Sequence, residues 1–328
     1  MQPIDIHAHF LPADYRELVA GAAPALAPEL RADGYLYAGG QRWTRIPPAM
    51  HDLPGRLARM DSAGLARQIL SAPPALFFYW ADGPGGAAVS RRLNEALAAA
   101  VASAPGRLLA FANVPLQDPD LAAGELEYAI QQLGHVGAQI GASVEGRDLD
   151  DPAFQPFFAA AERLDAPVFV HPLTFVGGER TREHYFPQLL AWPFDTSICI
   201  ARLIFGGVLD AFPRLRLCFA HAGGTLLFLK GRLDHGVRMG ATQTPSGRPP
   251  SAYLRQIYVD CLTYDAELLA QVVGTVGADR VLLGTDWPFP IGEPDPVGFV
   301  RRNALLPAGA ADAILAGNAA AFLGRTVA

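Results

Sequence analysis

Short apolar runs alternate with amphipathic stretches along most of this chain. The apolar runs cover residues 4–7, 68–71, 108–113, 136–140, 167–171, 215–220, 257–261 and 281–285. Most of them are apolar throughout, which is typical of parallel strands that are buried on both faces. Helical patterns lie between most of the runs, most clearly over residues 94–103, 120–133 and 152–164. This alternation predicts the α/β class, and eight strand–helix units favour a closed TIM (β/α)8 barrel over an open doubly wound sheet.

Two passages interrupt the repeat. Residues 13–54, after the first strand, are rich in proline, glycine and aromatic residues, and we expect a small β-hairpin with strands at 35–37 and 42–46. Residues 173–196 form a second irregular passage after the fifth strand. Because no repeat or linker divides the chain, we expect a single domain over residues 1–328, with 13–54 inserted over the barrel mouth.

Composition excludes several classes of function. The chain has a net charge of −6 and no long basic run, which argues against a nucleic-acid partner. It contains neither a window of 18 apolar residues nor a charged leader before an apolar stretch, so we expect no membrane span and no signal peptide. Cys199, Cys218 and Cys261 are widely spaced in apolar surroundings, which favours reduced core thiols in a cytoplasmic protein. No glycine-rich fingerprint follows the first strand, so a dinucleotide site has no support.

Two histidines stand at the end of the first predicted strand. Side chains of a strand alternate between its two faces, so His7 and His9 point the same way. Neutral imidazole is the commonest protein ligand for zinc and similar ions, so the pair forms half of a candidate metal site. Taken alone, the pair is equally compatible with an accidental arrangement.

Further polar residues follow later strands at the corresponding place. His171, His221 and Asp286 come at the ends of strands five, six and eight, and Asp260 lies near the end of strand seven. A polar side chain there is costly unless it is paired, and barrel active sites gather at the carboxyl ends of the strands. Each residue alone has an ordinary explanation, as a loop histidine or a turn aspartate. Together they predict one divalent metal ion bound by three histidines and one aspartate, with an open position for water.

The motifs around these residues resemble a known family. The chain is similar to the amidohydrolase superfamily, and within it to the branch that contains aminocarboxymuconate semialdehyde decarboxylase. The similar segments are residues 4–12, 78–81, 137–141, 159–164, 169–172, 218–224, 231–236, 283–290 and 316–324. The resemblance implies that His7, His9, His171 and Asp286 bind one zinc ion, with manganese as the alternative, and that His221 acts as acid and base. It also implies a homodimer.

The chain departs from this branch at two substrate-binding positions. Two arginines of the decarboxylase that bind substrate carboxylates correspond to Pro47 and Gly240 here. Bidentate recognition of a carboxylate by arginine is not replaced by an apolar residue, so we expect a different substrate. Other side chains could bind the substrate instead, although a solvated surface position is the more ordinary explanation for each arginine, and core packing explains each aromatic residue equally well. These candidates are Arg42, Arg45, Arg180, Arg182, Arg238, Tyr79 and Trp80.

These observations lead to a functional expectation. We expect a metal-dependent, non-oxidative decarboxylase of a small aromatic or ring-cleavage-derived carboxylic acid, with His221 and Asp286 as catalytic residues and no organic cofactor. The first alternative is a hydrolase or hydratase of a C–C, lactone, ester or amide substrate at the same site. The second is a metal-binding barrel without catalytic activity. His51 and His135 follow no strand end, and we expect both at the surface.

Overall fold

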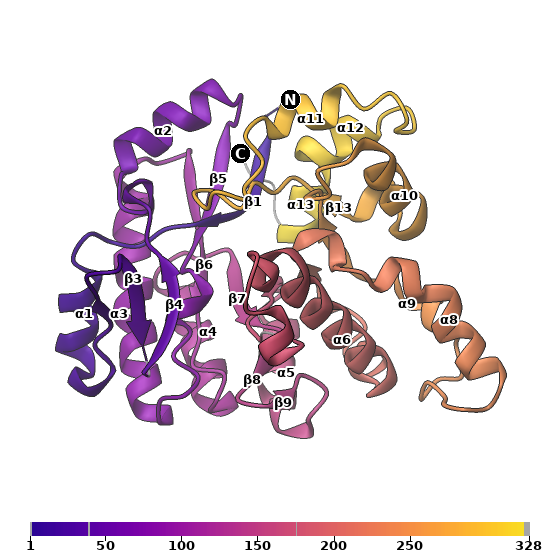
Figure 1. Ribbon diagram of the computed structural model, residues 1–328, viewed down its shortest axis with the longest axis horizontal. Helices are drawn as coiled ribbons and strands as arrows, with labels where there is room; N and C mark the ends of the chain where they lie inside the picture. Colours follow the sequence, from indigo (N-terminus) through magenta and orange to yellow (C-terminus); the bar gives the residue numbers. More distant parts are fainter. Residues whose placement is uncertain (1, 39, 175, 325–328) are drawn as a thin grey trace.

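The computed structural model describes residues 2–38, 40–174 and 176–324, and an eight-stranded parallel sheet forms its centre (Figure 1). Neighbouring strands follow the order β1-β5-β6-β7-β10-β11-β12-β13. Their bounds are Ile4–His9 (β1), Arg67–Ser71 (β5), Leu108–Asn113 (β6), Gly137–Gly141 (β7), Val168–His171 (β10), Leu217–Phe219 (β11), Tyr258–Asp260 (β12) and Val281–Leu282 (β13). All the predicted strands are present, which confirms the (β/α)8 barrel.

Closure of the barrel depends on the segment that follows β13. The amide of Ile6 donates to the carbonyl of Leu283 at 2.9 Å, and the amide of Asp286 donates to the carbonyl of His7 at 2.8 Å. A parallel bridge pairs Ala8 with Trp287. The first strand and the segment after the last strand therefore lie side by side, which brings His7 and His9 next to Asp286 from near the opposite end of the chain.

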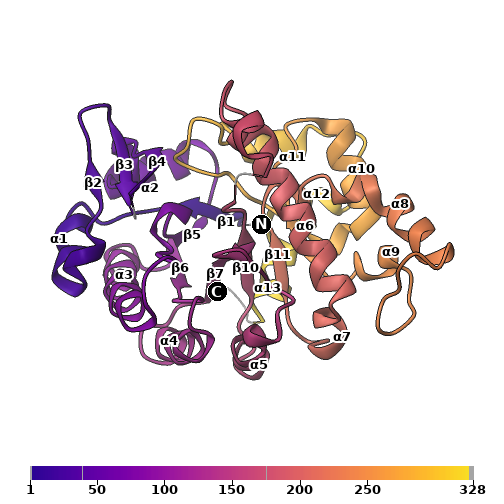
Figure 2. The same ribbon diagram turned by 60° about the horizontal axis from the view of Figure 1, so that its bottom comes forward.

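Helices surround the sheet (Figure 2). They cover Tyr15–Ala22 (α1), Leu53–Ser62 (α2), Gly83–Ser103 (α3), Pro119–Gln131 (α4), Gln155–Arg163 (α5), Trp192–Phe205 (α6), Val208–Ala211 (α7), Leu226–Arg238 (α8), Pro250–Tyr253 (α9), Ala266–Val276 (α10), Pro296–Arg301 (α11), Ala310–Asp312 (α12) and Asn318–Leu323 (α13). The side chains of Asp82, Asp118 and Asp265 accept hydrogen bonds from the first turns of α3, α4 and α10. These aspartates satisfy backbone donors that have no partner within the helix, so they define where the helices begin.

The interior of the barrel is apolar at one end. Ile6, Ile69, Phe111 and Phe169 are buried there together with Phe322 of α13. The rings of Phe111 and Phe322 meet edge to face, with their centroids 6.5 Å apart. Helix α13 therefore closes this end of the barrel, and the polar side chains gather at the opposite end, beyond the carboxyl termini of the strands.

The insertion after β1 contains the predicted hairpin and one further short strand. Its antiparallel sheet consists of Glu29–Leu30 (β2), Tyr35–Ala38 (β3) and Gln41–Arg45 (β4). Outside the insertion, Ser143–Val144 (β8) and Arg147–Asp148 (β9) form a separate two-stranded ribbon after β7. Tyr35 pairs with Arg45 across the hairpin, and Tyr37 pairs with Arg42. The guanidinium carbons of Arg42 and Arg45 lie 4.5 Å and 4.7 Å from the centre of the Tyr35 ring. These cation–π contacts help to hold the hairpin together.

The burial of the cysteines was predicted correctly from the sequence, whereas the burial of the histidines outside the predicted metal site was not. The three cysteines are free and buried, as expected. The prediction for His135 is wrong, because this side chain is only 1% exposed. Burial disfavours the charged ring and lowers its pKa, so the core holds the neutral imidazole. His51 is half-buried, and its ring stacks on Tyr15 with the centroids 5.6 Å apart.

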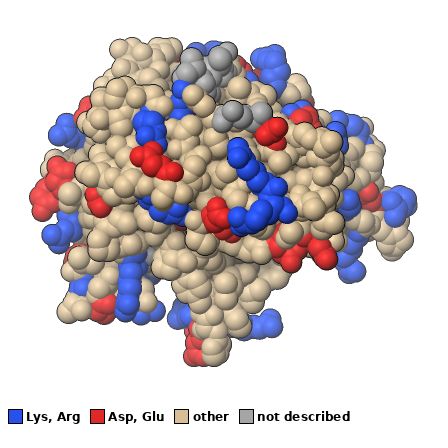
Figure 3. Space-filling view, turned by 90° about the horizontal axis from the view of Figure 1, so that it is seen from above, with Lys and Arg blue, Asp and Glu red and all other residues tan. Residues whose placement is uncertain are grey.

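The surface mixes both signs of charge. On the face in Figure 3, acidic and basic side chains lie singly or in small groups among uncharged residues. Within the described part of the chain, no helix is long and apolar enough to cross a membrane.

Candidate metal centre

The carboxyl ends of the barrel strands bring the predicted ligands to one point. His7 and His9 lie on one face of β1, and His171 is the last residue of β10. Asp286 follows β13 and is held beside β1 by its hydrogen bond to the His7 carbonyl. The sequence produces this arrangement because each ligand comes directly after, or at the end of, an apolar strand that the barrel buries.

The four side chains His7, His9, His171 and Asp286 form one compact, buried cluster. Each offers one ligand atom, and these atoms all lie within 4.8 Å of one another. Asp286 Oδ1 is 3.4 Å from His7 Nε2 and 3.2 Å from His9 Nε2. The His7 and His171 ring centroids are 5.2 Å apart. Three imidazoles and one carboxylate around one point are a donor set that suits zinc and other divalent transition metals.

Hydrogen bonds behind the cluster select the ring nitrogens that face its centre. His7 Nδ1 lies 2.8 Å from Asp260 Oδ2, and His171 Nδ1 lies 2.8 Å from the carbonyl oxygen of Pro172. A carbonyl or carboxylate only accepts, so both Nδ1 atoms carry the proton and donate it. In the neutral rings the lone pair is then on Nε2, which is the nitrogen directed at the other ligands.

The residues fit a metal ion by a direct observation. His7 Nε2, His9 Nε2 and Asp286 Oδ1 are buried without a hydrogen-bond partner. A buried polar atom without a hydrogen-bond partner typically costs about 1–3 kcal/mol. Three such atoms directed at one point therefore need a common partner. A cation coordinated by all three atoms satisfies this requirement.

Electrostatics also favour a cation at this point. Burial alone would raise the pKa of Asp286, but the histidines around it hold the pKa well below its usual range, so the group is a carboxylate. Burial opposes charge on His7 as well, yet Asp286 and Asp260 outweigh burial and raise its pKa to about 10. Burial and the neighbouring imidazoles hold the pKa of His171 well below its usual range. The two carboxylates thus attract one positive charge, which either a proton on His7 or a divalent cation supplies.

Asp260 connects the cluster to the segment that carries His221. Its carboxylate accepts hydrogen bonds from His7 Nδ1 and from the backbone amides of His221, Ala222 and Leu262, at 2.8–3.1 Å. His221 and Ala222 both have a φ of 55°, in the left-handed region that non-glycine residues rarely adopt. The bonds to Asp260 hold this strained segment in place, so that His221 Nε2 lies 3.7 Å from Asp286 Oδ2.

A buried polar network supports the cluster from inside the barrel. Asp5 is completely buried and accepts hydrogen bonds from Thr285 Oγ1 and Gln68 Nε2, each at 2.7 Å. Arg56 is also buried and donates to Gln68 Oε1 at 2.7 Å and to the His9 carbonyl at 2.6 Å. The sequence pointed to neither Arg56 nor Gln68, since no local pattern marks an arginine on an amphipathic helix as buried.

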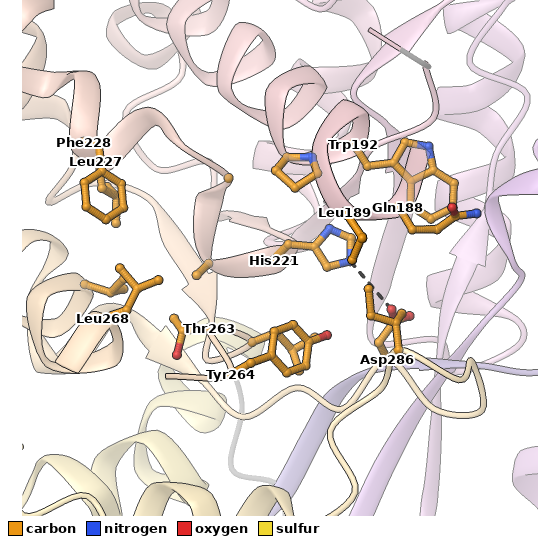
Figure 4. A pocket seen from close by; sticks show the side chains of 16 residues that line it. Gln188, Leu189, Trp192, His221, Leu227, Phe228, Thr263, Tyr264, Leu268 and Asp286 are labelled. Carbon is orange, nitrogen blue, oxygen red and sulfur yellow. Dashed lines mark ion pairs between the residues drawn. The ribbon is translucent and has the colours of Figure 1, made fainter. Parts of the chain in front are cut away.

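A cavity of about 270 Å³ lies in front of the cluster (Figure 4). Its walls are Gln188, Leu189, Trp192, Pro193, His221, Ala222, Gly224, Leu227, Phe228, Leu262, Thr263, Tyr264, Leu268, Val272, Asp286 and Ile291. Most of them are apolar, and they come from α6 and the turn before it, from α8 and α10, and from the loops after β11, β12 and β13. Asp286 belongs both to this wall and to the ligand cluster, so a molecule in the cavity reaches the metal site. The size suits a small ligand.

None of the predicted substrate-binding side chains is among the residues that line this cavity. Tyr79 is buried, and its hydroxyl accepts a hydrogen bond from the amide of Gly141 at 3.0 Å. Trp80 lies against Phe78, with the ring centroids 5.2 Å apart. Arg182 forms an exposed ion pair with Glu179. The other candidate arginines, Arg42, Arg45, Arg180 and Arg238, are exposed, so a role for any of the five arginines in substrate binding stays a prediction.

Several residues of the cavity wall were not predicted from the sequence. Gln188 and Trp192 belong to the passage over 173–196, which the sequence marked as irregular but not residue by residue. Tyr264 follows β12 and has a φ of 55°. Its position four residues after Asp260 could have marked Tyr264 as a wall residue, because substrate-binding side chains of a barrel follow the ends of its strands.

Comparison with known proteins places these features in a family. The model of the amidohydrolase family matches residues 4–325. The 2-amino-3-carboxymuconate-6-semialdehyde decarboxylase of Dictyostelium discoideum is 33% identical over 98% of this chain and 91% of its own length. A gamma-resorcylate decarboxylase of Rhizobium radiobacter is 32% identical over 84% of this chain and 93% of its own length. A dihydroxybenzoic acid decarboxylase of a Polaromonas species, solved with bound manganese and the inhibitor 2-nitroresorcinol, superposes with a TM-score of 0.78. It is 26% identical, and the match covers 98% of this chain and 97% of that one.

Proposed function

The chain belongs to the amidohydrolase family, in the branch of metal-dependent decarboxylases, and we propose that it removes CO2 from a small aromatic or ring-cleavage-derived carboxylic acid without oxidation. The observation that carries the proposal is the position of the ligand cluster at the wall of an apolar cavity, where the His221 imidazole lies beside Asp286. A flat ring fits such apolar walls, while its carboxylate needs the charged end of the cavity.

His7, His9 and His171 would hold the metal through ring nitrogens, and Asp286 through its carboxylate. A divalent cation in this place supplies positive charge that orients a substrate oxygen and stabilises the negative charge of the transition state. Asp260 keeps His7 in the required tautomer, and the apolar wall excludes water from the reacting carbon.

His221 supplies the proton in this proposal. When the bond between the ring carbon and the carboxyl carbon breaks, the electron pair stays on the ring carbon and CO2 leaves. The ring carbon then takes a proton from His221, which recovers one from water. The strained backbone at His221 supports this role, because it aims the imidazole across the cavity wall toward Asp286 (Figure 4).

The identity of the metal and the state of the protein are further parts of the proposal. We propose zinc, with manganese as the alternative because the Polaromonas relative binds manganese. We also propose a cytoplasmic homodimer, supported by the three free buried cysteines and by the exposed apolar side chains of Phe194, Ile198 and Phe228 on α6 and α8. The family match over residues 4–325 supports one domain over 1–328 with 13–54 as an insertion.

The test is a release assay on the protein loaded separately with zinc and with manganese. We expect CO2 from hydroxybenzoic acids such as 2,6-dihydroxybenzoate, and no turnover of an ester and lactone panel. His221→Ala should keep its metal, measured by mass spectrometry of the ion, and lose 10²–10⁴-fold in kcat. His235→Ala, which removes an exposed histidine of α8, is the matched control. Clear ester or lactone cleavage without CO2 release would contradict the proposal in favour of a hydrolase.

A further inference from the structure

The cavity extends away from the metal cluster as an apolar arm. The walls of this arm are Leu227 and Phe228 of α8, Leu262 after β12, and Leu268 and Val272 of α10. In Figure 4, Leu227, Phe228 and Leu268 lie at the end of the cavity opposite Asp286, with Thr263 and Tyr264 between. Leu227, Leu262 and Val272 are buried, whereas Phe228 is 64% exposed and lies at the rim.

The distribution of charge in the cavity restricts what this arm accepts. Among the wall residues that the structure describes, none is lysine or arginine, and the Asp286 carboxylate and the His221 imidazole both lie at the metal end. A divalent cation held by the cluster would supply positive charge for one carboxylate of a ligand there. A second carboxylate in the arm would lose its hydration and find no cation among these wall residues, which is strongly unfavourable.

Resting on the proposed function, we infer that the substrate is a monocarboxylic acid whose ring carries an apolar substituent, and that this substituent occupies the arm between α8 and α10. Leu268 is then a residue that determines specificity. It lies in the first turn of α10, half-buried, with its side chain directed into the arm (Figure 4). Burying one methylene group of a ligand improves binding by about fourfold, so affinity should rise with the length of the substituent until the arm is full.

The experiment measures binding and turnover separately on the metal-loaded protein. The ligands are 2-hydroxybenzoic acids with hydrogen, methyl, propyl, pentyl or carboxylate at position 4, across the ring from the reacting carboxylate. Calorimetry gives Kd, and CO2 release gives kcat/KM. We expect Kd to fall about fourfold per methylene along the alkyl series, and the 4-carboxy compound to bind at least 100-fold more weakly than the 4-propyl compound.

Two variants assign the effect to the arm. Leu268→Lys places a cation in the arm, so it should remove the gain from alkyl groups and improve binding of the 4-carboxy compound by tenfold or more. Gln271→Lys adds the same charge on the exposed side of α10, outside the cavity wall, and should keep the wild-type order of affinities.

The outcomes separate this inference from the proposed function. Equal Kd values for the unsubstituted and alkyl acids, or equal changes in both variants, would overturn the inference even if CO2 is released. A gain in affinity with alkyl length without any CO2 release would support the inference and contradict decarboxylation. If Leu268→Lys weakens dimerisation and leaves the order of ligands unchanged, the arm receives a second copy of the chain, and the inference is wrong.

Discussion

The ligand cluster and the cavity in front of it meet at Asp286, but they are built in opposite ways. The cluster stands on strand ends, is buried, and has the imidazoles of His7 and His171 oriented by Asp260 and the Pro172 carbonyl. The cavity is built from helices and loops, its walls are mostly apolar, and some of them, such as Phe228, are largely exposed. The barrel therefore holds the cluster rigidly, while the walls are free to differ in size and polarity.

The backbone is strained at the boundary between the two regions. His221, Tyr264 and Asp286 have φ values of 55–57°, and all three side chains line the cavity. Non-glycine residues in this region typically cost 1–3 kcal/mol each, and the surrounding structure must supply that energy. Asp260 and the strand-end hydrogen bonds do so here, which ties the positions of His221 and Asp286 to the rigid side of the boundary.

Asp286→Asn should have the largest effect, because it removes the charge that both regions share. We expect loss of bound metal and a fall in kcat of at least 10³-fold, about 4 kcal/mol. Metal content and CO2 release measure this. Glu267→Gln, which neutralises an exposed carboxylate on α10, should change neither quantity. A variant that still binds one equivalent of metal and turns over would remove Asp286 from the ligand set.

Replacing His135 tests how a buried histidine outside the metal cluster changes the free energy of unfolding at low pH. Burial lowers its pKa from 6.5 to about 4, so the unfolded chain takes up this proton at a higher pH than the folded chain does. Its contribution to the free energy of unfolding is thus constant above pH 6.5 and falls by about 3 kcal/mol as the pH drops from 6.5 to 4. Denaturant titrations at several pH values should show a shallower decline in His135→Gln. Parallel wild-type and variant curves would contradict the assignment.

Asp260→Asn tests whether orientation of the ligands matters separately from their presence. An asparagine amide in this place donates to His7 Nδ1 and forces the ring proton onto Nε2, the nitrogen that faces the metal. We expect metal affinity to fall 10–100-fold, about 1.4–2.7 kcal/mol, in a chelator competition. The melting temperature and near-UV circular dichroism of the variant check that it folds. Unchanged affinity in a folded variant would mean that Asp260 serves the backbone of His221 alone.

Leu189→Ala should have the smallest effect and shows how tolerant the cavity wall is. Leu189 is 49% exposed, so its truncation should lower the free energy of unfolding by no more than about 0.5 kcal/mol and leave metal content unchanged. Only KM should respond, by a few-fold, because the side chain contributes to the cavity wall. Urea titration, metal analysis and steady-state kinetics measure these quantities. Loss of metal in this variant would mean that wall and cluster are coupled after all.

The sequence by itself determined the barrel and the ligand set. Apolar runs with β-type composition predicted the eight strands, and the two-residue period of a strand placed His7 and His9 on one face. Because barrel strands end at a common edge, His171, His221 and Asp286 could be assigned to the same place without knowledge of any contact. These predictions succeeded because each depends on local geometry repeated along the chain.

Only the tertiary structure decided what surrounds that set. Three features depend on residues from distant elements of the chain. They are the burial of Arg56 and His135, the four hydrogen bonds to Asp260, and the arm between α8 and α10. Local sequence does not reveal burial of a polar group, since the same arginine or histidine is equally stable on a solvated face. Strand ends are positioned by the backbone and can be predicted from pattern, whereas cavity walls depend on how helices and loops pack against one another.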